Sequence, residues 1–318
     1  MIMKYVGIDI GGTSIKGGFV SENGEILNRF GFPIDKNASQ EELIQRLGDL
    51  INEQIVKCDY KKSDFAGIGI GCPGSINSDT GTCDFSGNLN WHHLPIVKMI
   101  EEKTGMKARI ANDANAAMAG EAKFGVGKNY HNLVLLTLGT GVGGGLYLND
   151  HLYVGNEGKG AEMGHMIIAM DGIHCSCGLT GCLEAYASVT ALIRQTKEAM
   201  EKDKNSLMWD YVAYDINKVD GKTAFECSKQ GDKTALAVVD QYEDYLTVGC
   251  LNYCNIFRPD AIILGGGLSN QREYLTDAIA KKLKKFNYGF ESTSPVKVFV
   301  SALGNDAGIL GAAALFID

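Results

Sequence analysis

The chain has 318 residues, 45% of them hydrophobic, and a formal net charge of −8. This length exceeds what one hydrophobic core usually organises, so we expect two domains, and the acidic balance argues against a nucleic-acid partner, which normally meets a basic surface. No segment reaches the ~20 apolar residues of a membrane helix and no signal-peptide pattern precedes the first strand, so we expect a cytoplasmic protein without a membrane partner.

Strands and turns open the chain. Tyr5–Ile10 is apolar and rich in β-branched residues, which predicts a strand, and Gly11-Gly12-Thr13 then predicts a turn into a returning strand over Ser14–Val20. Ser39 and Glu42 form a capping box, and apolar residues at helical spacing follow it. Further strands are expected over 25–30, 65–71 and 108–111, and a further helix over 114–124.

The opening pattern returns in the second half of the chain. Leu133–Leu138 predicts a strand, Gly139-Thr140-Gly141 a turn, and Gly143–Leu148 a returning strand. Two strand–turn–strand units, one in each half, suggest two related domains. The remainder is expected to be mainly helical, with helices over 183–200, 235–257 and 308–316 and strands over 261–264 and 296–301.

Both glycine turns suit phosphate groups. Phosphate binding needs converging backbone N–H groups and residues small enough for close approach, and a Thr hydroxyl adds a donor. Gly11-Gly12-Thr13 and Gly139-Thr140-Gly141 meet these needs. Asp9, just before the first turn, makes sense beside phosphates only if Mg²⁺ neutralises the repulsion. A pair of tight hairpins without a ligand is the alternative.

Two other nucleotide motifs do not fit. The chain has no G-x-x-x-x-G-K-[ST], so it is not a P-loop enzyme. Gly139–Gly144 matches G-x-G-x-x-G, but a dinucleotide fingerprint must open a helix, whereas Gly145–Asp150 predicts a strand and a turn. We therefore reject an NAD site.

One histidine and three cysteines have the spacing of a metal site. They are His165, Cys175, Cys177 and Cys182, in the pattern H-x₉-C-x-C-x₄-C. One imidazole and three thiolates form a closed tetrahedral Zn²⁺ set, which is structural because no position stays open for water. The alternative is a chance cluster of cysteines. If the second ring nitrogen of His165 faces a pocket, the ion would also orient a substrate contact.

Polar residues that suit a hydroxylated substrate lie near these motifs. Asp113 follows a strand and starts a helix, where an aspartate can take the proton of a substrate hydroxyl during phosphoryl transfer. An ordinary Asn/Asp helix cap at Asn112-Asp113 is the alternative. Glu162, His165 and Glu184 add acceptors and a donor that suit the vicinal hydroxyls of a sugar; a hydrated acidic surface is the alternative there.

Five segments together resemble the ROK family of sugar kinases and repressors, across nearly the whole chain. The cysteine motif with its upstream histidine is the most specific of them, while the glycine turns are shared with the wider group of actin-like ATPases. The segments are Asp9–Lys16 (DIGGTSIK), Asn112–Glu121 (NDANAAMAGE), Leu136–Gly145 (LTLGTGVGGG), Glu162–His165 (EMGH) and Cys175–Glu184 (CSCGLTGCLE).

The resemblance implies an α/β ribonuclease-H-like (actin-like ATPase) fold with two domains around a cleft that holds ATP and Mg²⁺. We expect a small N-terminal domain over 1–115, with the C-terminal helix 304–318 packing back on it. A large domain over 116–303 would carry the zinc knuckle.

The resemblance also implies roles for individual residues. It implies that Asp113 is the catalytic base, and so favours that role over the helix-cap alternative. The positions matching sugar contacts are Asn88, Asn112, Asp113, Glu162, His165 and Glu184. Those matching the nucleotide side are Asp9, Gly11, Gly12, Thr13, Lys16, Gly139, Thr140, Gly141, Gly265, Gly266 and Gly267.

Within the family the kinase branch is favoured, because repressors carry an added N-terminal helix-turn-helix and here the first strand begins at Tyr5. Asn88–Trp91 and Gly221–Ala235 look like segments of bacterial glucokinases, so glucose is the expected substrate. Kinases for N-acetylmannosamine, fructose, allose or a β-glucoside share the core pocket and remain open. A non-catalytic sugar sensor is the rival class, an ATPase acting on protein lacks support, and the family suggests a homodimer.

Overall fold

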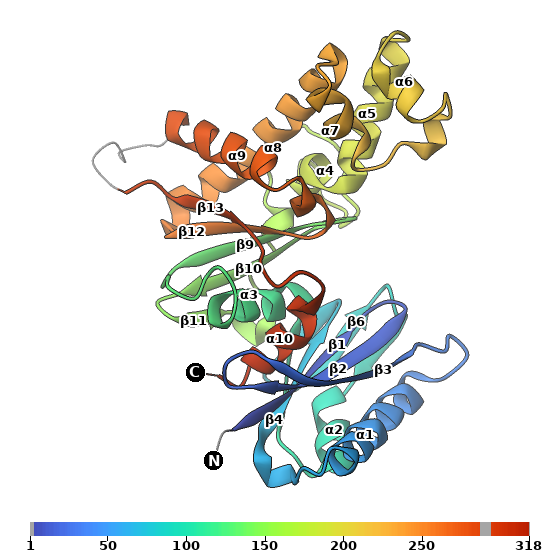
Figure 1. Cartoon of the computed structure of the whole chain (residues 1–318), viewed down its shortest axis with the longest axis vertical. Helices are drawn as coiled ribbons and strands as arrows, with labels where there is room; N and C mark the ends of the chain where they lie inside the picture. The colour runs from blue at the N-terminus through green and yellow to red at the C-terminus, as the bar shows by residue number, and fades with distance from the viewer. Residues whose placement is uncertain (1–2, 287–293, 318) are drawn as a thin grey trace. The chain divides into compact units, whose positions relative to one another are not determined.

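Two five-stranded sheets form the framework of the chain in the computed structural model, which describes residues 3–286 and 294–317 (Figure 1). The first contains β1 (Lys4–Ile10), β2 (Ser14–Ser21), β3 (Ile26–Pro33), β4 (Phe65–Cys72) and β8 (Ala108–Asn112). The second contains β9 (Leu133–Leu138), β10 (Val142–Leu148), β11 (His151–Tyr153), β12 (Ala261–Gly265) and β13 (Lys297–Val300). A small third sheet contains β5 (Ser75–Asn77), β6 (Thr82–Ser86) and β7 (Trp91–Leu94).

Helices connect and cover the strands. The α-helices are α1 (Gln40–Lys57), α2 (Ile96–Thr104), α3 (Asp113–Lys123), α4 (Glu184–Ala187), α5 (Val189–Lys202), α6 (Leu207–Tyr211), α7 (Thr223–Lys229), α8 (Lys233–Phe257), α9 (Glu273–Phe286) and α10 (Ala307–Ala314). Short 3₁₀ turns lie at Lys62–Asp64, Asn156–Gly158, Met163–His165, Ile216–Lys218, Gly267–Gln271 and Gly304–Asp306.

The two large sheets have the same strand order relative to the chain. The first runs β3-β2-β1-β4-β8 and the second β11-β10-β9-β12-β13. In the first, β1 pairs antiparallel with β2 and parallel with β4. In the second, β12 runs parallel to both β9 and β13. The predicted repeat of a strand–turn–strand unit therefore extends to whole sheets.

Contacts between Cα atoms divide the chain into two compact units. The first is Met1–Tyr130 with Gly145–Ala161 and Ala302–Asp318, and the second is His131–Gly144 with Glu162–Ser301. The boundary expected at residue 115 falls inside α3, whereas the division falls after Tyr130. α3 groups with the first unit because it packs on α10, where a Cβ at Gly311 would come within 2.2 Å of the Ala116 carbonyl oxygen. Residues 1, 2, 287–293 and 318 of the expected domains lie outside the described residues.

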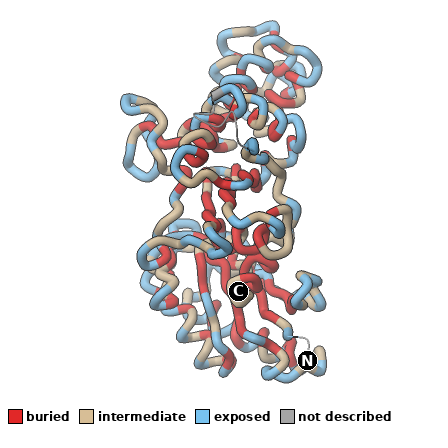
Figure 2. The backbone as a smooth tube through the Cα atoms, turned by 90° about the vertical axis from the view of Figure 1, so that its left-hand side faces the viewer, coloured by how far each residue is buried: buried red, intermediate tan, exposed pale blue. Residues whose placement is uncertain are grey.

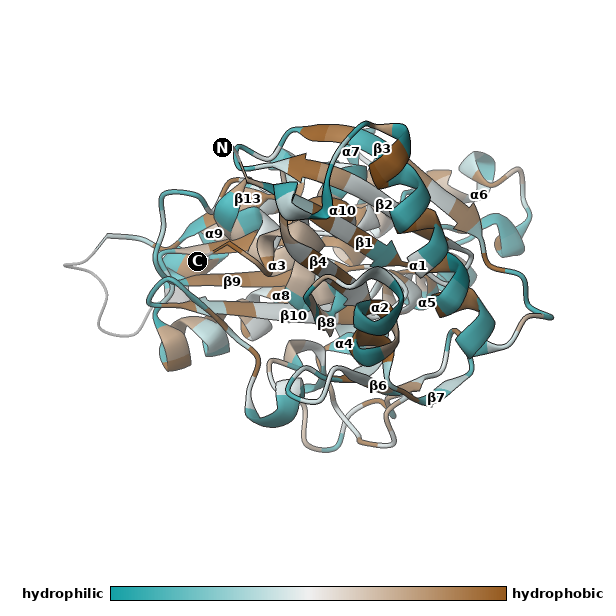
Figure 3. Ribbon diagram, turned by 90° about the horizontal axis from the view of Figure 1, so that it is seen from below, coloured by the Kyte–Doolittle hydropathy of each residue, from teal (hydrophilic) through white to brown (hydrophobic). Residues whose placement is uncertain are grey.

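Successive side chains of β1 point to opposite faces of the first sheet, and the two faces pack against different helices. Val6, Ile8 and Ile10 pack into a core with apolar residues of α1 and α2, and α1 shows both hydrophilic and hydrophobic segments in Figure 3. The other face meets α10. A Cβ at Gly7 would lie 2.0 Å from the Ile309 carbonyl oxygen, so the helix backbone rests directly on the strand. Buried residues run through the middle of the tube in Figure 2, and they come from helices as well as strands.

The predicted capping box of α1 is confirmed. The Ser39 hydroxyl accepts from the Glu42 N–H at 3.1 Å, and the Glu42 carboxylate accepts from the Ser39 N–H at 2.8 Å. The single helix expected over 183–200 is wrong: it is two helices, α4 and α5, which are separated at Ser188. Ser188 takes an extended conformation and its hydroxyl accepts from the Ala191 N–H, so it caps a new helix instead of continuing the old one.

Across residues 3–286 and 294–317, none of the helices has the length and hydropathy needed to span a membrane.

A lysine of α9 holds three acidic residues of α8. The Lys282 ammonium lies 2.7 Å from Asp240, 2.6 Å from Asp244 and 3.7 Å from Glu243. The Glu243 side chain is only 9% exposed. Burial, opposed by Lys282, raises the pKa of Glu243 to about 7 from its ordinary 4.5.

The Glu243 carboxyl predicts a pH dependence of stability. A pKa that is higher in the folded than in the unfolded state favours folding below about pH 4.5, and that contribution is lost as the pH rises through about 7. We expect Glu243→Gln to raise Tm relative to the parent chain more at pH 8 than at pH 5, measured by circular dichroism. Glu198→Gln, which removes an exposed partner of Arg194, is the matched control and should change Tm little at either pH. An equal effect of Glu243→Gln at both pH values would contradict the assignment.

Candidate functional site

The first glycine turn joins β1 to β2 at the end of the first sheet. The Gly11 N–H donates to the Ser14 carbonyl at 3.0 Å, and the Ile34 N–H donates to the Thr13 carbonyl at 2.9 Å, so β3 braces the turn. Gly12 and Thr13 are exposed, and a Cβ at Gly12 would meet nothing within 4 Å. The turn thus presents open backbone, as a phosphate-binding turn requires.

Asp9 is the acidic residue beside this turn. It lies opposite Lys16 in the β1–β2 ladder, and it is on the face of β1 that meets α10. A Cβ at Gly308 would come within 2.3 Å of the Asp9 Cγ, so the helix leaves space for the carboxylate only because residue 308 is glycine. Burial raises the pKa of Asp9, and Lys16 opposes that rise. A half-buried carboxylate with one flanking cation is suited to receive a divalent metal ion.

Asn112 and Asp113, at the start of α3, differ in their contacts and exposure. Asn112 is the N-cap of α3: its Oδ1 accepts from the Ala114 N–H at 2.9 Å, and its Nδ2 donates to the Gly74 carbonyl at 3.1 Å. Asp113 is the first residue of the helix and is exposed, although its Oδ1 also lies 2.9 Å from the Ala114 nitrogen. Asn112 is therefore the N-cap, and it shares the Ala114 N–H with the Asp113 carboxylate.

Asn88 lines a cavity of about 530 Å³ in the first unit together with Gly12 of the first turn. Sequence reasoning missed the other wall, which the segment before α1 and its first turn provide, including Asp35, Lys36 and Glu41. Gln40 fixes this wall, since its side chain exchanges hydrogen bonds with the His92 backbone at 3.0 and 3.1 Å. The only sequence signal nearby was the Ser39 capping box, which located the helix but not the cavity.

The second glycine turn rests on the start of α5. The Val189 N–H donates to the Gly139 carbonyl and the Thr190 hydroxyl donates to the Thr140 carbonyl, both at 2.8 Å. Within the turn, the Gly139 N–H donates to the Gly141 carbonyl at 3.0 Å. Thr140 stays exposed. Both carbonyls that point toward α5 are therefore satisfied.

Gly265-Gly266-Gly267 lies at the same end of the second sheet as that turn. Gly265 pairs with Thr137 in the parallel β12–β9 ladder, two residues before Gly139. Gly266 has a φ of 80°, and a Cβ there would come within 2.5 Å of the Leu138 carbonyl oxygen. The structure thus brings together the two glycine segments that were predicted on the nucleotide side of the second half.

Glu184, the first residue of α4, links the second turn to the cysteine segment. Its Oε2 accepts from the Val142 N–H at 3.0 Å, just after the turn. Its Oε1 accepts from the Ser176 hydroxyl at 3.1 Å and lies 3.5 Å from the Cys175 Sγ. The same carboxylate therefore touches both motifs that sequence reasoning had treated separately.

The four predicted metal ligands converge. One ligand atom from each of His165, Cys175, Cys177 and Cys182 lies within 4.8 Å of the others, so together they could hold a metal ion. The Cys177 and Cys182 sulfurs are 3.7 Å apart, and the His165 Nδ1 is 3.8 Å from the Cys175 sulfur. Burial, followed by the neighbouring thiols, raises the pKa of Cys182 to about 12.

His165 and Glu162 come from one short 3₁₀ turn. Glu162 precedes it and is exposed, and its carbonyl accepts from the His165 N–H at 3.1 Å. His165 directs Nδ1 toward the Cys175 sulfur, so its Nε2 is on the opposite side of the ring. That the second ring nitrogen faces a substrate remains a prediction.

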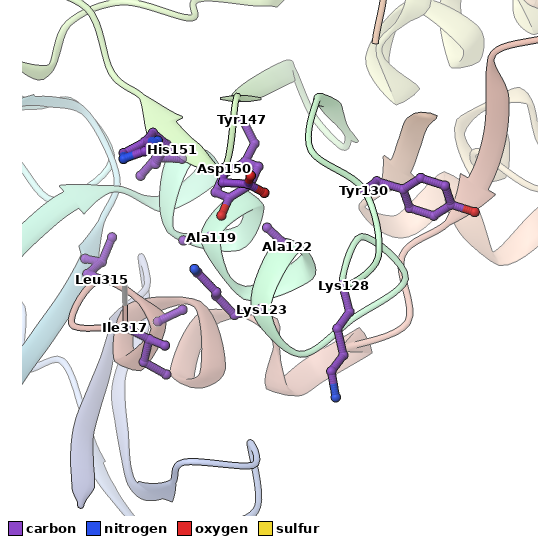
Figure 4. A pocket seen from close by; sticks show the side chains of 12 residues that line it. Ala119, Ala122, Lys123, Lys128, Tyr130, Tyr147, Asp150, His151, Leu315 and Ile317 are labelled. Atoms are coloured by element: carbon purple, nitrogen blue, oxygen red, sulfur yellow. The ribbon is translucent and has the colours of Figure 1, made fainter. Parts of the chain in front are cut away.

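A larger cavity, of about 620 Å³, lies at the other end of α3 from Asp113 (Figure 4). Lys123 and Tyr147 line it, and the lysine ammonium lies 5.9 Å from the centre of the tyrosine ring. None of the residues predicted for catalysis, nucleotide, sugar or metal contributes to it. The larger of the two cavities is therefore not the one that the predicted site residues line.

The chain matches the model of the ROK family over residues 5–318. It is 38% identical to a glucokinase from Thermotoga maritima over 98% of this chain and 97% of that protein. It is 36% identical to a glucokinase from Halalkalibacterium halodurans over 96% and 93%, respectively. A crystal structure of a ROK family glucokinase from Streptomyces griseus, in complex with glucose and AMPPNP, superposes with a TM-score of 0.78 at 32% identity, covering 98% of both chains. The predicted ribonuclease-H-like α/β fold is thereby confirmed.

The cap at Asn112 predicts different costs for two neighbouring substitutions. Asn112→Ala removes the cap and the bond to Gly74, and we expect it to lower Tm by about 2 °C, the result of a loss of about 1 kcal/mol. Asp113→Asn keeps the cap and should lower Tm less. Differential scanning calorimetry of both variants checks this, and a larger loss for Asp113→Asn would identify Asp113 as the structural cap.

Proposed function

Because the chain belongs to the ROK family, we propose that it phosphorylates glucose with ATP, giving glucose 6-phosphate and ADP. The observation that carries the proposal is its similarity to glucokinases over nearly the whole chain. Asp113 supports it, because this aspartate is exposed at the start of α3 and another residue caps that helix.

In the proposed reaction the sugar O6 attacks the γ-phosphorus of ATP in line. The new O6–P bond forms as the bond to the β-phosphate oxygen breaks, ADP leaves with that electron pair, and Asp113 accepts the hydroxyl proton. The Gly11–Thr13 and Gly139–Gly141 turns, with Lys16 and Gly265–Gly267, would hold nucleotide phosphates through backbone N–H groups and positive charge. Asp9 would hold Mg²⁺, which when bound neutralises phosphate charge.

The sugar would be held by acceptors and donors from several loops. Asn88, Asn112, Glu162, His165 and Glu184 are the proposed contacts. Both polar atoms of the Asn112 side chain already have hydrogen-bond partners within the protein, so a sugar hydroxyl would share Oδ1 or Nδ2 with them. Glu184 and Glu162 would accept from sugar hydroxyls, and His165 would present its Nε2 side.

The His165–Cys182 cluster would hold a structural zinc ion. Two thiolates bound to one tetrahedral zinc at ~2.3 Å stand about 3.8 Å apart, and the Cys177 and Cys182 sulfurs are 3.7 Å apart. Four protein ligands leave no open position, so the ion would order the loop and orient His165.

Other sugars are the alternative substrates for the same site. A kinase for N-acetylmannosamine, fructose, allose or a β-glucoside would use the same base and turns, and a non-catalytic sugar sensor would need neither. We propose a cytoplasmic homodimer, a state that light scattering measures directly.

The proposed activity predicts ADP release that depends on both glucose and Asp113. We expect glucose to give the highest kcat/KM in a coupled ADP-release assay across hexoses and N-acetylhexosamines. Asp113→Asn should lower kcat by at least about 10²-fold, as loss of a general base does, while glucose binding measured by calorimetry stays within about threefold. No sugar-dependent ADP release would favour the sensor, and a near-normal kcat for Asp113→Asn would refute the base.

The metal cluster predicts about one zinc ion per chain by atomic emission. Cys177→Ser should lower the zinc content and weaken glucose binding, because the ion orders the loop that carries His165 and Ser176. His165→Ala should lose both zinc and sugar affinity. Cys58→Ser, at a cysteine outside the cluster, is the control and should retain both. Full zinc content in His165→Ala would remove this residue from the ligand set.

A further inference from the structure

Gly141, in the second glycine turn, has no conformational reason to be glycine. Its φ does not lie in the positive region, unlike that of Gly266. Nor does the protein backbone crowd it. Apart from the neighbouring residues of the chain, the three atoms nearest to a Cβ built at this position all belong to Glu184, whose Oε2 would lie 2.4 Å away and whose Cδ 3.2 Å away.

Gly139, two residues earlier in the same turn, is different. A Cβ there would meet nothing within 4 Å, and its φ is not positive either. Both glycines satisfy the need of a phosphate for open backbone, yet only one of them is pressed against a side chain. A methyl group added at Gly141 would therefore displace Glu184, whereas one added at Gly139 would only cover backbone that a phosphate could approach.

Two further contacts fix the Glu184 carboxylate on either side of this space. The Val142 N–H donates to Oε2 at 3.0 Å, and the Ser176 hydroxyl donates to Oε1 at 3.1 Å. Glu184 is only partly exposed, and its carboxylate holds one bond to the turn segment and one to the cysteine loop. A carboxylate held by donors on both of its oxygens has a defined position and keeps lone pairs for a hydroxyl donor.

We propose that Gly141 and Ser176 are positioning residues for the sugar-binding carboxylate Glu184, so that a residue of the nucleotide turn controls sugar affinity. This rests on the proposed function, in which Glu184 contacts the sugar. A methyl group at residue 141 displaces the carboxylate and breaks its bond to Val142. The sugar then loses a charge-assisted hydrogen bond, although the substitution lies in the segment assigned to phosphate.

The test is glucose binding by calorimetry without nucleotide, for Gly141→Ala and for its matched control Gly139→Ala. We expect Gly141→Ala to weaken glucose binding about 10–100-fold, the range for a lost hydrogen bond to a charged group. Gly139→Ala should change glucose binding less than about twofold and act on the KM for ATP instead. Unchanged glucose binding in Gly141→Ala, or an equal loss in Gly139→Ala, overturns the proposal.

Two more variants keep the test decisive if Gly141→Ala folds poorly. Ser176→Ala adds no bulk at an exposed position, and it should raise the glucose Kd about 3–10-fold with zinc content and Tm unchanged. In a Glu184→Asp background the shorter side chain vacates the space, so adding Gly141→Ala should cost less than about twofold. Full additivity of the two substitutions contradicts the proposal.

Failure of the proposed kinase activity and failure of the proposed role of Gly141 give different results. If the parent chain turns over another hexose instead of glucose, that hexose replaces glucose in the binding experiment, and the comparison of Gly141→Ala with Gly139→Ala stands. If the parent chain binds glucose without phosphorylating it, the kinase assignment fails while the role of Gly141 is still measured.

Discussion

Close approach of backbone to neighbouring atoms, made possible by missing side chains, is the constraint on which both units depend. In the first unit α10 rests on the sheet because Gly7 and Gly69 carry no Cβ; at Gly69 a Cβ would overlap the Ala312 carbonyl oxygen. Dense packing of this kind leaves no room for even one methyl group without a shift of the backbone. The position of α10 over β1 and β4 follows from it.

The same constraint places charged groups in both units. Gly308 leaves room for the Asp9 carboxylate at the start of α10, and Gly141 leaves room for that of Glu184 beside the second turn. In each case a glycine on one element leaves room for a carboxylate on another. The glycine-rich composition of the chain, 40 residues, therefore serves its polar groups as well as its turns.

A second recurring feature is the burial of acidic groups whose nearby positive charge does not offset the cost of burying them. Asp9 and Cys182 both have a raised pKa because burial disfavours their charged forms. Both lie where a cation is chemically suited, Mg²⁺ for the carboxylate and Zn²⁺ for the thiols. Burial raises the pKa of Glu243 in the same way, but there Lys282 of the protein supplies the neighbouring cation.

The sequence by itself predicted most strands of the two large sheets, the two glycine turns, the convergence of His165 with three cysteines, and the family. Each depends on residues close together in the chain or on spacings that backbone geometry restricts. The short strands β5, β6, β7 and β11 were not predicted. The sequence also implied the repeat, which the common strand order of the two sheets extends. Only the tertiary structure separated Asn112 from Asp113, because the cap depends on where the side-chain oxygens point. It alone divided the helix expected over 183–200, where the Ser188 side chain competes with the helix for backbone N–H groups. It alone joined Glu184 to Gly141, since residues more than 40 positions apart meet through packing that no local pattern records.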